Sequence, residues 1–296
     1  MMGRFTVGIL IVSLAGCTAE TSVDNNSADK ANVTNEMVMV PAGDFVMGCN
    51  PAADANCRAD EMPHQRLFLD AFTLDKYEVT QADFAKCVAV GSCTAAKTDF
   101  DPELDWGGLA PAALTSPELA WPALGITWNQ ADAFCKWAGK RLPTEPEWEK
   151  AARGGCELYN DCESDSPMNP WGNALASCDN AVYMTPDELL GCGDGGALPV
   201  NSRPTGVSPY GAYNMIGNVS EWVDGLYEPY AETARASMNN EAIGMRVNKG
   251  ACYGSFQSDL RIAARFTMLD AANYDLDYNL ETDSAMGFRC AADVAK

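Results

Sequence analysis

The sequence has little of what metal sites and nucleic-acid surfaces usually require. It contains one histidine, His64, and none of its twelve cysteines stands in a Cys-x-x-Cys pair. A structural zinc site is therefore not expected, and His64 is interpreted as a structural surface residue. Basic residues are also scarce, because 20 Lys and Arg stand against 41 Asp and Glu, a formal net charge of −21. Phosphate binding needs clustered basic side chains, so nucleic acid is excluded as a partner and direct docking on anionic lipid is disfavoured.

The N-terminal apolar run is too short for a membrane span, which takes about 20 residues. It extends from Phe5 to Leu14 and leads into Leu14-Ala15-Gly16-Cys17, small residues before a cysteine as in a bacterial lipobox. We expect residues 1–16 to be a signal peptide, with cleavage before Cys17 and acylation of the Cys17 thiol. The lipid would then be the only membrane attachment of an extracytoplasmic protein of the cell envelope. Thr18 after the cysteine favours the outer membrane if the cell has one.

A flexible tether is expected to follow the anchor. Residues 18–36 are mainly Ser, Thr, Asn, Asp and Ala, with almost no large apolar side chain. Such a segment cannot bury enough surface to offset its ordering entropy. We therefore assign residues 17–36 to a lipidated tether. Residues 37–296 contain no second linker of that composition, so one domain is preferred to two smaller ones.

The stretch from Gly125 to Gly155 predicts two short helices that meet at a tight corner. Apolar residues at Ala131, Phe134 and Cys135 have the spacing of one helical face, and Gly139 stands where a left-handed C-terminal cap would lie. The second helix begins at the capping box Thr144-Glu145-Pro146-Glu147. Its end is predicted at Gly154-Gly155.

Other elements are expected to be short. Met37–Val40 and Phe45–Met47 flank Pro41-Ala42-Gly43-Asp44, which predicts a β-hairpin. The alternating residues around Leu67 and Leu69 predict a half-buried strand, and Thr80 with Asp83 predicts a capped helix. Beyond the two central helices, Gly, Pro, Asn and Asp recur every few residues, which indicates a loop-rich body.

Twelve cysteines behind a signal peptide indicate an oxidising compartment and a disulfide framework. With Cys17 reserved for lipid, an odd number is left for pairing. Close spacing suggests loop-closing pairs, although sequence alone does not fix connectivity. The suggested pairs are Cys49–Cys57, Cys87–Cys93, Cys156–Cys162 and Cys178–Cys192.

Five segments together resemble the formylglycine-generating enzyme (sulfatase-modifying factor) family. The central one, at residues 128–155, reads WNQADAFCKWAGKRLPTEPEWEKAARGG and is similar to the family signature. The other four agree with the family in order, and they are Met39–Gly48, Asp60–Phe84, Tyr210–Trp222, and Arg246–Gly254 with Gly287–Asp293. The resemblance covers nearly the whole mature chain. It implies an α+β fold, a loop-rich variant of the C-type-lectin fold.

The resemblance also implies one long-range disulfide, between Cys135 and Cys290. A second long-range disulfide of vertebrate-type members falls here on Ala152 and Ile262, so both partners are absent together. Cys252 is thereby left without an obvious mate. Three interpretations are open: Cys252 is an inert buried thiol, it pairs with a cysteine of one of the suggested pairs, or it is a reactive group.

Calcium is the cofactor that the resemblance favours. Calcium takes six to eight hard oxygen ligands, and irregular loops present carbonyls to it. The implied ligands are the Asn214 side chain, the Gly217 and Val219 carbonyls, and the Glu221 carboxylate. A weaker second site, where the spacing departs from the family, would use Asn180, Ala181 and Asp194. The alternative for the first loop is a turn held by asparagine side chains.

Copper, by contrast, is not expected. The family's enzymes oxidise a cysteine of a sulfatase to formylglycine, and by resemblance two cysteines bind copper(I) for this reaction. The first falls at Ser255 and the second near Leu260, so neither thiol is present. Cys252 instead occupies the position of a serine beside the family's active site, and it is the weak catalytic candidate of this chain.

Two functions of different classes follow. The first is a non-catalytic or re-purposed scaffold that presents the family's groove to an unknown protein or peptide partner. The alternative is a formylglycine-generating-type oxidoreductase acting on a protein cysteine, with Cys252 and the substrate thiol sharing a metal. A purely structural role at the cell surface is not distinguished from the first by sequence.

Overall fold

The computed structural model describes residues 36–96, 120–230, 245–268 and 285–294. The expected signal peptide, Cys17 and the tether up to residue 35 therefore lie outside the described residues. Within the described ranges, no helix has the length and apolar character that crossing a membrane requires.

Small sheets and short helices joined by long loops make up the described part of the molecule. One sheet has the strand order β1-β4-β9, a second is the pair β2-β3, and a third has the order β7-β6-β5-β8. The strands are β1 (Met37–Val40), β2 (Gly43–Met47), β3 (Gln65–Leu69), β4 (Phe72–Asp75), β5 (Ser220–Leu226), β6 (Arg246–Lys249), β7 (Phe266–Met268), β8 (Met286–Phe288) and β9 (Ala291–Asp293). This mixture of elements is the α+β, loop-rich fold expected from the sequence.

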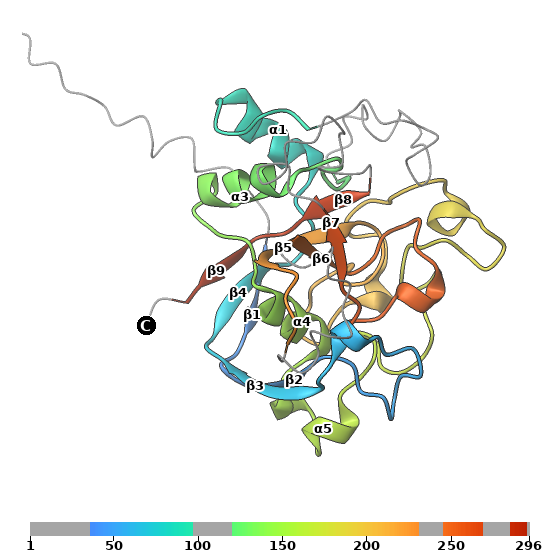
Figure 1. The fold of residues 1–296 in the computed structure, drawn as a ribbon. Helices are drawn as coiled ribbons and strands as arrows, with labels where there is room; N and C mark the ends of the chain where they lie inside the picture. Colours follow the sequence, from blue (N-terminus) through green and yellow to red (C-terminus); the bar gives the residue numbers. More distant parts are fainter. Residues whose placement is uncertain (1–35, 97–119, 231–244, 269–284, 295–296) are drawn as a thin grey trace, which may run out of the picture.

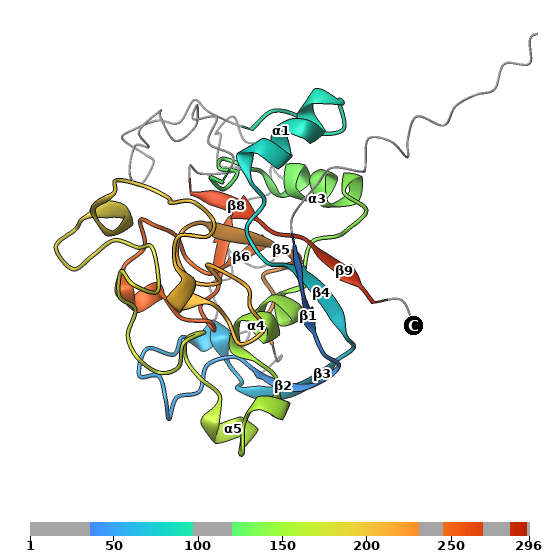
Figure 2. The same cartoon turned by 180° about the vertical axis from the view of Figure 1, so that it is seen from behind.

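The helices lie around and between these sheets. The α-helices are α1 (Gln81–Ala89), α3 (Trp128–Trp137), α4 (Glu145–Arg153) and α5 (Cys162–Asp165). Short 3₁₀ helices occur at η2 (Ala59–Glu61), η3 (Cys156–Leu158), η4 (Leu190–Gly193), η5 (Pro204–Gly206) and η7 (Gln257–Asp259). Figures 1 and 2 show α1 and α3 together at one end, β2 and β3 at the other, and α4 between the two ends.

The caps predicted for the two central helices are present. The Thr144 side chain accepts a hydrogen bond from the Glu147 backbone, and the Glu147 carboxylate accepts one from Thr144 N, 2.8 Å away. Helix α3 is followed by Gly139 with φ of 75°, a left-handed conformation that glycine adopts without strain. The predicted strand at Leu67 and the predicted helix after Thr80 are also confirmed.

The predicted hairpin of Met37–Val40 with Phe45–Met47 is wrong. Strand β1 pairs antiparallel with β4, and β2 pairs antiparallel with β3, so the two strands belong to different sheets. The connection between them is held by α4, because Lys150 Nζ donates to the Pro41 and Gly43 carbonyls over 2.7 and 2.9 Å. A buried ammonium group needs such acceptors, and the pairing of each strand with a different partner keeps the two strands apart.

Two apolar clusters form most of the core. One surrounds α4 and contains Trp148, with Ala152 and Ile262 both fully buried in it. The two positions that correspond to the family's second disulfide thus belong to the same apolar cluster. The other cluster joins α3 to β8 and contains Phe134 and Phe288.

The disulfide framework agrees with the sequence-based pairing. The loop-closing bonds are Cys49–Cys57, Cys87–Cys93, Cys156–Cys162 and Cys178–Cys192. The Cys135–Cys290 bond implied by the family resemblance is also formed, and it ties α3 to the segment before β9. The ten cysteines of these pairs all keep the expected partners, so the interpretation of Cys252 as the partner of one of them is wrong.

Candidate functional site

The loop Asn214–Glu221 lies in the interior and has an irregular backbone. Asn214, Gly217 and Asn218 adopt positive φ angles of 50°, 81° and 66°. At Gly217 an added Cβ would lie 2.5 Å from the Val182 carbonyl oxygen, so only glycine fits there. Asn tolerates the left-handed conformation better than most residues, which explains the two asparagines. The local sequence thus dictates a turn whose peptide groups point in several directions.

Glu78, which follows β4, reaches this loop from a distant part of the chain. Its carboxylate is fully buried and accepts hydrogen bonds from Asn214 Nδ2 and Asn218 Nδ2, both at 2.9 Å. The pKa of Glu78 is raised to about 7: burial is the main cause, Arg289 opposes the shift, and the nearby Glu221 carboxylate adds to it. The loop motif does not include Glu78, which stands in the mostly polar stretch between β4 and α1, residues 76–80.

Glu221 lies in the buried part of β5 and is held on both oxygens. Arg289 donates from Nη2 to Oε1 over 2.6 Å and from Nε to Oε2 over 2.7 Å, a bidentate pair. Trp148 Nε1 donates to Oε2 over 2.8 Å. Helix α4, strand β5 and the segment after β8 therefore meet at this carboxylate.

The donor chemistry of this region fits calcium. Two buried carboxylates, Glu78 and Glu221, are opposed by one guanidinium, Arg289, so a further cation would be favoured electrostatically. The Asn214 side chain and the loop carbonyls at Gly217 and Val219 offer the hard oxygens that calcium prefers. Glu78 is an additional candidate ligand beside the predicted set. Arg289 already engages Glu221, so calcium would share that carboxylate with it.

The residues of the second predicted calcium set, Asn180, Ala181 and Asp194, make separate local contacts. Asn180 uses its side-chain oxygen within its own turn, where Oδ1 accepts a hydrogen bond from Ser177 N over 2.9 Å. Ala181 is buried, and Asp194 follows η4, where its N–H donates to the Gly191 carbonyl. Asn180 also lines an open hollow of about 540 Å³ together with Asp179 and Arg203.

Cys252 lies directly beside Ser255. Its Sγ is 3.4 Å from Ser255 Oγ, and the same hydroxyl accepts a hydrogen bond from Cys252 N over 3.0 Å. Ser255 N in turn donates to the Cys252 carbonyl over 3.0 Å. The half-buried thiol and the hydroxyl therefore share one tight turn.

The two positions where the resemblance would place copper ligands do not fit copper(I). Ser255 offers a hydroxyl, a hard ligand that copper(I) binds poorly, and Leu260 is 1% exposed within the apolar core. Cys252 is the one thiol near these positions in the described part of the chain. The arrangement lacks the pair of soft ligands that a copper(I) site uses.

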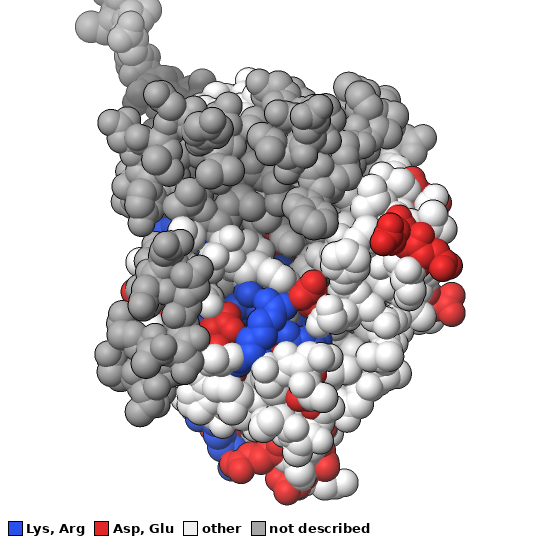
Figure 3. Space-filling model, turned by 45° about the vertical axis from the view of Figure 1, so that its right-hand side comes forward, with Lys and Arg blue, Asp and Glu red and all other residues white. Residues whose placement is uncertain are grey.

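Charged side chains gather on one face with both signs side by side. Figure 3 shows a group of Lys and Arg in a hollow of an otherwise mostly uncharged surface, with Asp and Glu directly beside it. Close ion pairs occur at several places in the described residues, such as Arg265 with Glu145 at 2.7 Å and Arg58 with Asp259 at 2.6 Å. Such pairs leave the arginines less charge to offer a phosphate.

Comparison with known proteins gives a consistent result. The family described as "Sulfatase-modifying factor enzyme 1-like domain" matches residues 23–294. The formylglycine-generating enzyme of Mus musculus is 32% identical over 311 residues, which cover 87% of this chain and 75% of that protein. The inactive C-alpha-formylglycine-generating enzyme 2 of Mus musculus is 29% identical and covers 88% of this chain and 86% of its own length. The solved structure of PvdO from Pseudomonas aeruginosa has a TM-score of 0.62 at 22% identity, covers 91% of this chain and 97% of its own, and shares the fold.

Proposed function

Because the chain belongs to the sulfatase-modifying factor family, we propose that it is a lipid-anchored extracytoplasmic binding protein without formylglycine-generating activity. The observation that carries this proposal is the pair of side chains at the expected copper positions. Ser255 supplies no thiol, and Leu260 is packed in the core. One relative carries the name of an inactive enzyme, so loss of the activity has a precedent in the family. The direct test is mass spectrometry of a cysteine-containing peptide incubated with the protein.

The proposed role is to present a rigid surface to a protein or peptide partner. The five disulfides and the buried ion pairs fix the long loops, which lowers the entropy lost when a partner binds. The open hollow beside Asn180 and Arg203 has a volume of about 540 Å³, and its lining is largely polar. It is the place where a polar segment of a partner would fit.

One observation favours the alternative, an oxidoreductase that acts on a protein cysteine. The Cys252 thiol is partly exposed and lies against Ser255, next to the position of the first copper cysteine. A substrate thiol beside Cys252 would supply a second soft ligand. The peptide assay separates this alternative from the binding role, because only the alternative produces an aldehyde.

Membrane attachment is predicted to depend on Cys17. In a cell that acylates it, the wild-type protein should fractionate with membranes, whereas the Cys17→Ala variant should be soluble or keep its signal peptide. Fractionation followed by mass spectrometry of the N-terminus measures both. Wild-type protein found in the medium with an unmodified Cys17 would contradict the lipoprotein assignment.

Calcium is the proposed ligand of the Asn214–Glu221 loop. Ions that bind only the folded state stabilise it by mass action, by about 2.7 kcal/mol at a hundredfold excess over Kd. Chelation should therefore lower the melting temperature of the wild-type protein by several degrees, and Asn214→Ala should remove that response. Calorimetry with and without chelator measures both effects.

A matched control distinguishes the two candidate sites. Asn180→Ala removes a ligand of the weaker second site only, so it should leave the response to chelation intact. An unchanged melting curve of the wild type on chelation would count against calcium at the first loop.

A further inference from the structure

An open hollow lies at the surface between two loop segments, residues 177–180 and 202–205. Its volume is about 540 Å³. Among the described residues, its lining carries one basic side chain, Arg203, and one acidic side chain, Asp179. The proposed binding role places a polar segment of a partner here, but it does not say which chemical group these charges would recognise.

Contacts between the two segments hold the hollow in shape. Thr205 Oγ1 donates a hydrogen bond to the Asp179 carbonyl. Gly206 packs directly against Asn180, because an added Cβ there would lie 1.8 Å from the Asn180 carbonyl oxygen. A hollow that is fixed in this way loses little conformational entropy when a ligand binds.

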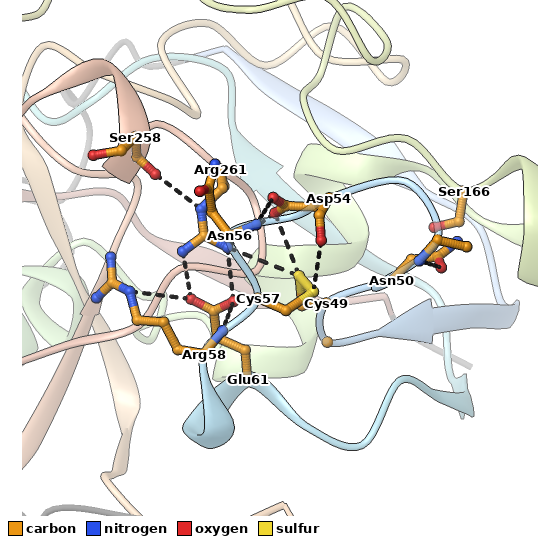
Figure 4. Close-up of a disulfide and its surroundings, with 12 residues drawn as sticks. Cys49, Asn50, Asp54, Asn56, Cys57, Arg58, Glu61, Ser166, Ser258 and Arg261 are labelled. Carbon is orange, nitrogen blue, oxygen red and sulfur yellow. Dashed lines mark hydrogen bonds and ion pairs between the residues drawn. A yellow bond between two sulfur atoms is a disulfide. The ribbon is translucent and has the colours of Figure 1, made fainter.

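Arg203 has no acidic partner among the described residues. Its Nη1 donates only to the carbonyl of the preceding residue, Ser202, over 3.4 Å, and both Arg203 Nε and Ser202 Oγ are buried without a hydrogen-bond partner. Figure 4 shows the opposite case, in which Arg261 donates to the Asp54 and Glu61 carboxylates at once. Native proteins rarely leave polar groups unsatisfied, so the donors of Arg203 remain available to a ligand.

Building on the binding role proposed above, we propose that this hollow binds the carboxylate of an aspartate or glutamate side chain in a peptide segment of the partner. Arg203 is partly exposed and unpaired, so its guanidinium is free to turn and donate two parallel hydrogen bonds to a carboxylate. Asn180 lines the same hollow and uses only its side-chain oxygen, so its Nδ2 offers a further donor.

The charges of the lining favour a single carboxylate over a phosphate. One guanidinium offsets one negative charge, whereas phosphate binding needs clustered basic side chains. The exposed Asp179 carboxylate in the same lining repels any further negative charge. The net charge of −21 also repels acidic chains as a whole. The matching segment therefore carries one acidic residue among uncharged neighbours.

The hydrogen bonds of the hollow favour a side chain over a C-terminal carboxylate. Chain termini are commonly captured by free backbone N–H groups. Here the backbone N–H groups of Ser177, Asn180 and Ser202 already donate to oxygens within their own turns. The donors left for a ligand belong to side chains, which reach an acidic side chain entering from the open side.

The experiment titrates the purified protein with acetylated pentapeptides and follows the arginine Nε–H signals by NMR. The first peptide, Ac-Ala-Ala-Glu-Ala-Ala-amide, carries the proposed carboxylate, and its Gln counterpart carries none. A third, the Gln peptide with a free C-terminus, carries only a terminal carboxylate. The Glu peptide should shift the Arg203 signal, which is identified by its absence from Arg203→Gln. It should also bind about tenfold more tightly than either Gln peptide.

Matched variants assign this binding to the hollow. Arg203→Lys keeps the charge but loses the planar fork, so it should weaken binding of the Glu peptide. Asp179→Asn removes the opposing negative charge and should strengthen it. Arg66→Gln removes an exposed arginine of β3, 3.6 Å from Asp44, and should leave binding unchanged.

Two results with the wild-type protein overturn the proposal without any variant having to fold: an Arg203 signal that the Glu peptide does not move, and equal binding of the Glu and Gln amides. Tighter binding of the peptide with the free C-terminus would overturn the assignment to a side chain. Binding that persists undiminished in Arg203→Gln overturns the carboxylate site but leaves the binding role intact. The binding role itself is tested separately, by aldehyde formation in the cysteine-peptide assay.

Discussion

Replacing both Cys135 and Cys290 with alanine is expected to lower the free energy of unfolding by about 5 kcal/mol. The bond joins residues 155 positions apart, and the chain-entropy treatment assigns a closure of that length about 5 kcal/mol. Both sulfurs are fully buried beside Phe134 and Phe288, so the loss of apolar contacts adds to the effect. Because domains are typically stable by only 5–15 kcal/mol, a large part of the stability should disappear. Equilibrium unfolding in urea, followed by circular dichroism, measures the change.

The Cys87→Ala/Cys93→Ala variant is the matched control. Its bond lies in the same apolar cluster but spans only 6 positions, for which the same treatment gives about 2 kcal/mol. The two variants should therefore differ by about 3 kcal/mol. Equal losses in both would show that the long closure does not stabilise the chain as argued.

Elements with local causes could be predicted from the sequence. The Thr144 capping box and Gly139 each act within four residues, so the ends of α3 and α4 follow from neighbouring side chains. The loop-closing disulfides join cysteines 6 to 14 positions apart, and their nearness in sequence nearly forces nearness in space. Local rules therefore succeed where the partner is a sequence neighbour.

The hairpin prediction failed because the two strands pair with β4 and β3 instead of with each other, and a remote residue binds their connection. Lys150 is more than 100 positions from the Pro41 and Gly43 carbonyls that it binds. Nothing between Met37 and Met47 reveals that a buried ammonium group must be satisfied there. Turn residues alone indicated a reversal of the chain, but not which strands would pair.

In the candidate calcium region, too, the local part could be predicted from the sequence and the remote residues could not. The loop from Asn214 to Glu221 could be found from its sequence, since its asparagines and Gly217 adopt the positive φ angles of a tight turn. Glu78 and Arg289 come from 136 positions before Asn214 and 68 positions after Glu221. They were missed because one sequence carries no record of which distant residues touch.

The two expected copper positions differ in their surroundings as well as their chemistry. Ser255 lies in a tight turn with Cys252, and Cys252 packs on the cluster that contains Tyr253. Leu260 packs instead in the cluster around Trp148 and Ile262. A thiol at position 260 would therefore lie in the apolar core, apart from the turn that holds Ser255. The chain thus differs from a copper site both in where these two side chains lie and in their ligand atoms.

No formylglycine is therefore expected from a sulfatase-type cysteine peptide, with or without added copper. A site of Cys252 and the substrate thiol would have to replace two protein thiolates, and a misplacement of about 1 Å already costs about a hundredfold in rate. Mass spectrometry of the peptide after incubation measures the conversion, with the mouse formylglycine-generating enzyme as the active control on the same peptide. Aldehyde formed by this protein and abolished by Cys252→Ser would establish the oxidoreductase alternative instead. Aldehyde that persists in Cys252→Ser would contradict both the binding role without activity and the oxidoreductase that uses Cys252. The thiol near the expected copper positions would then be dispensable.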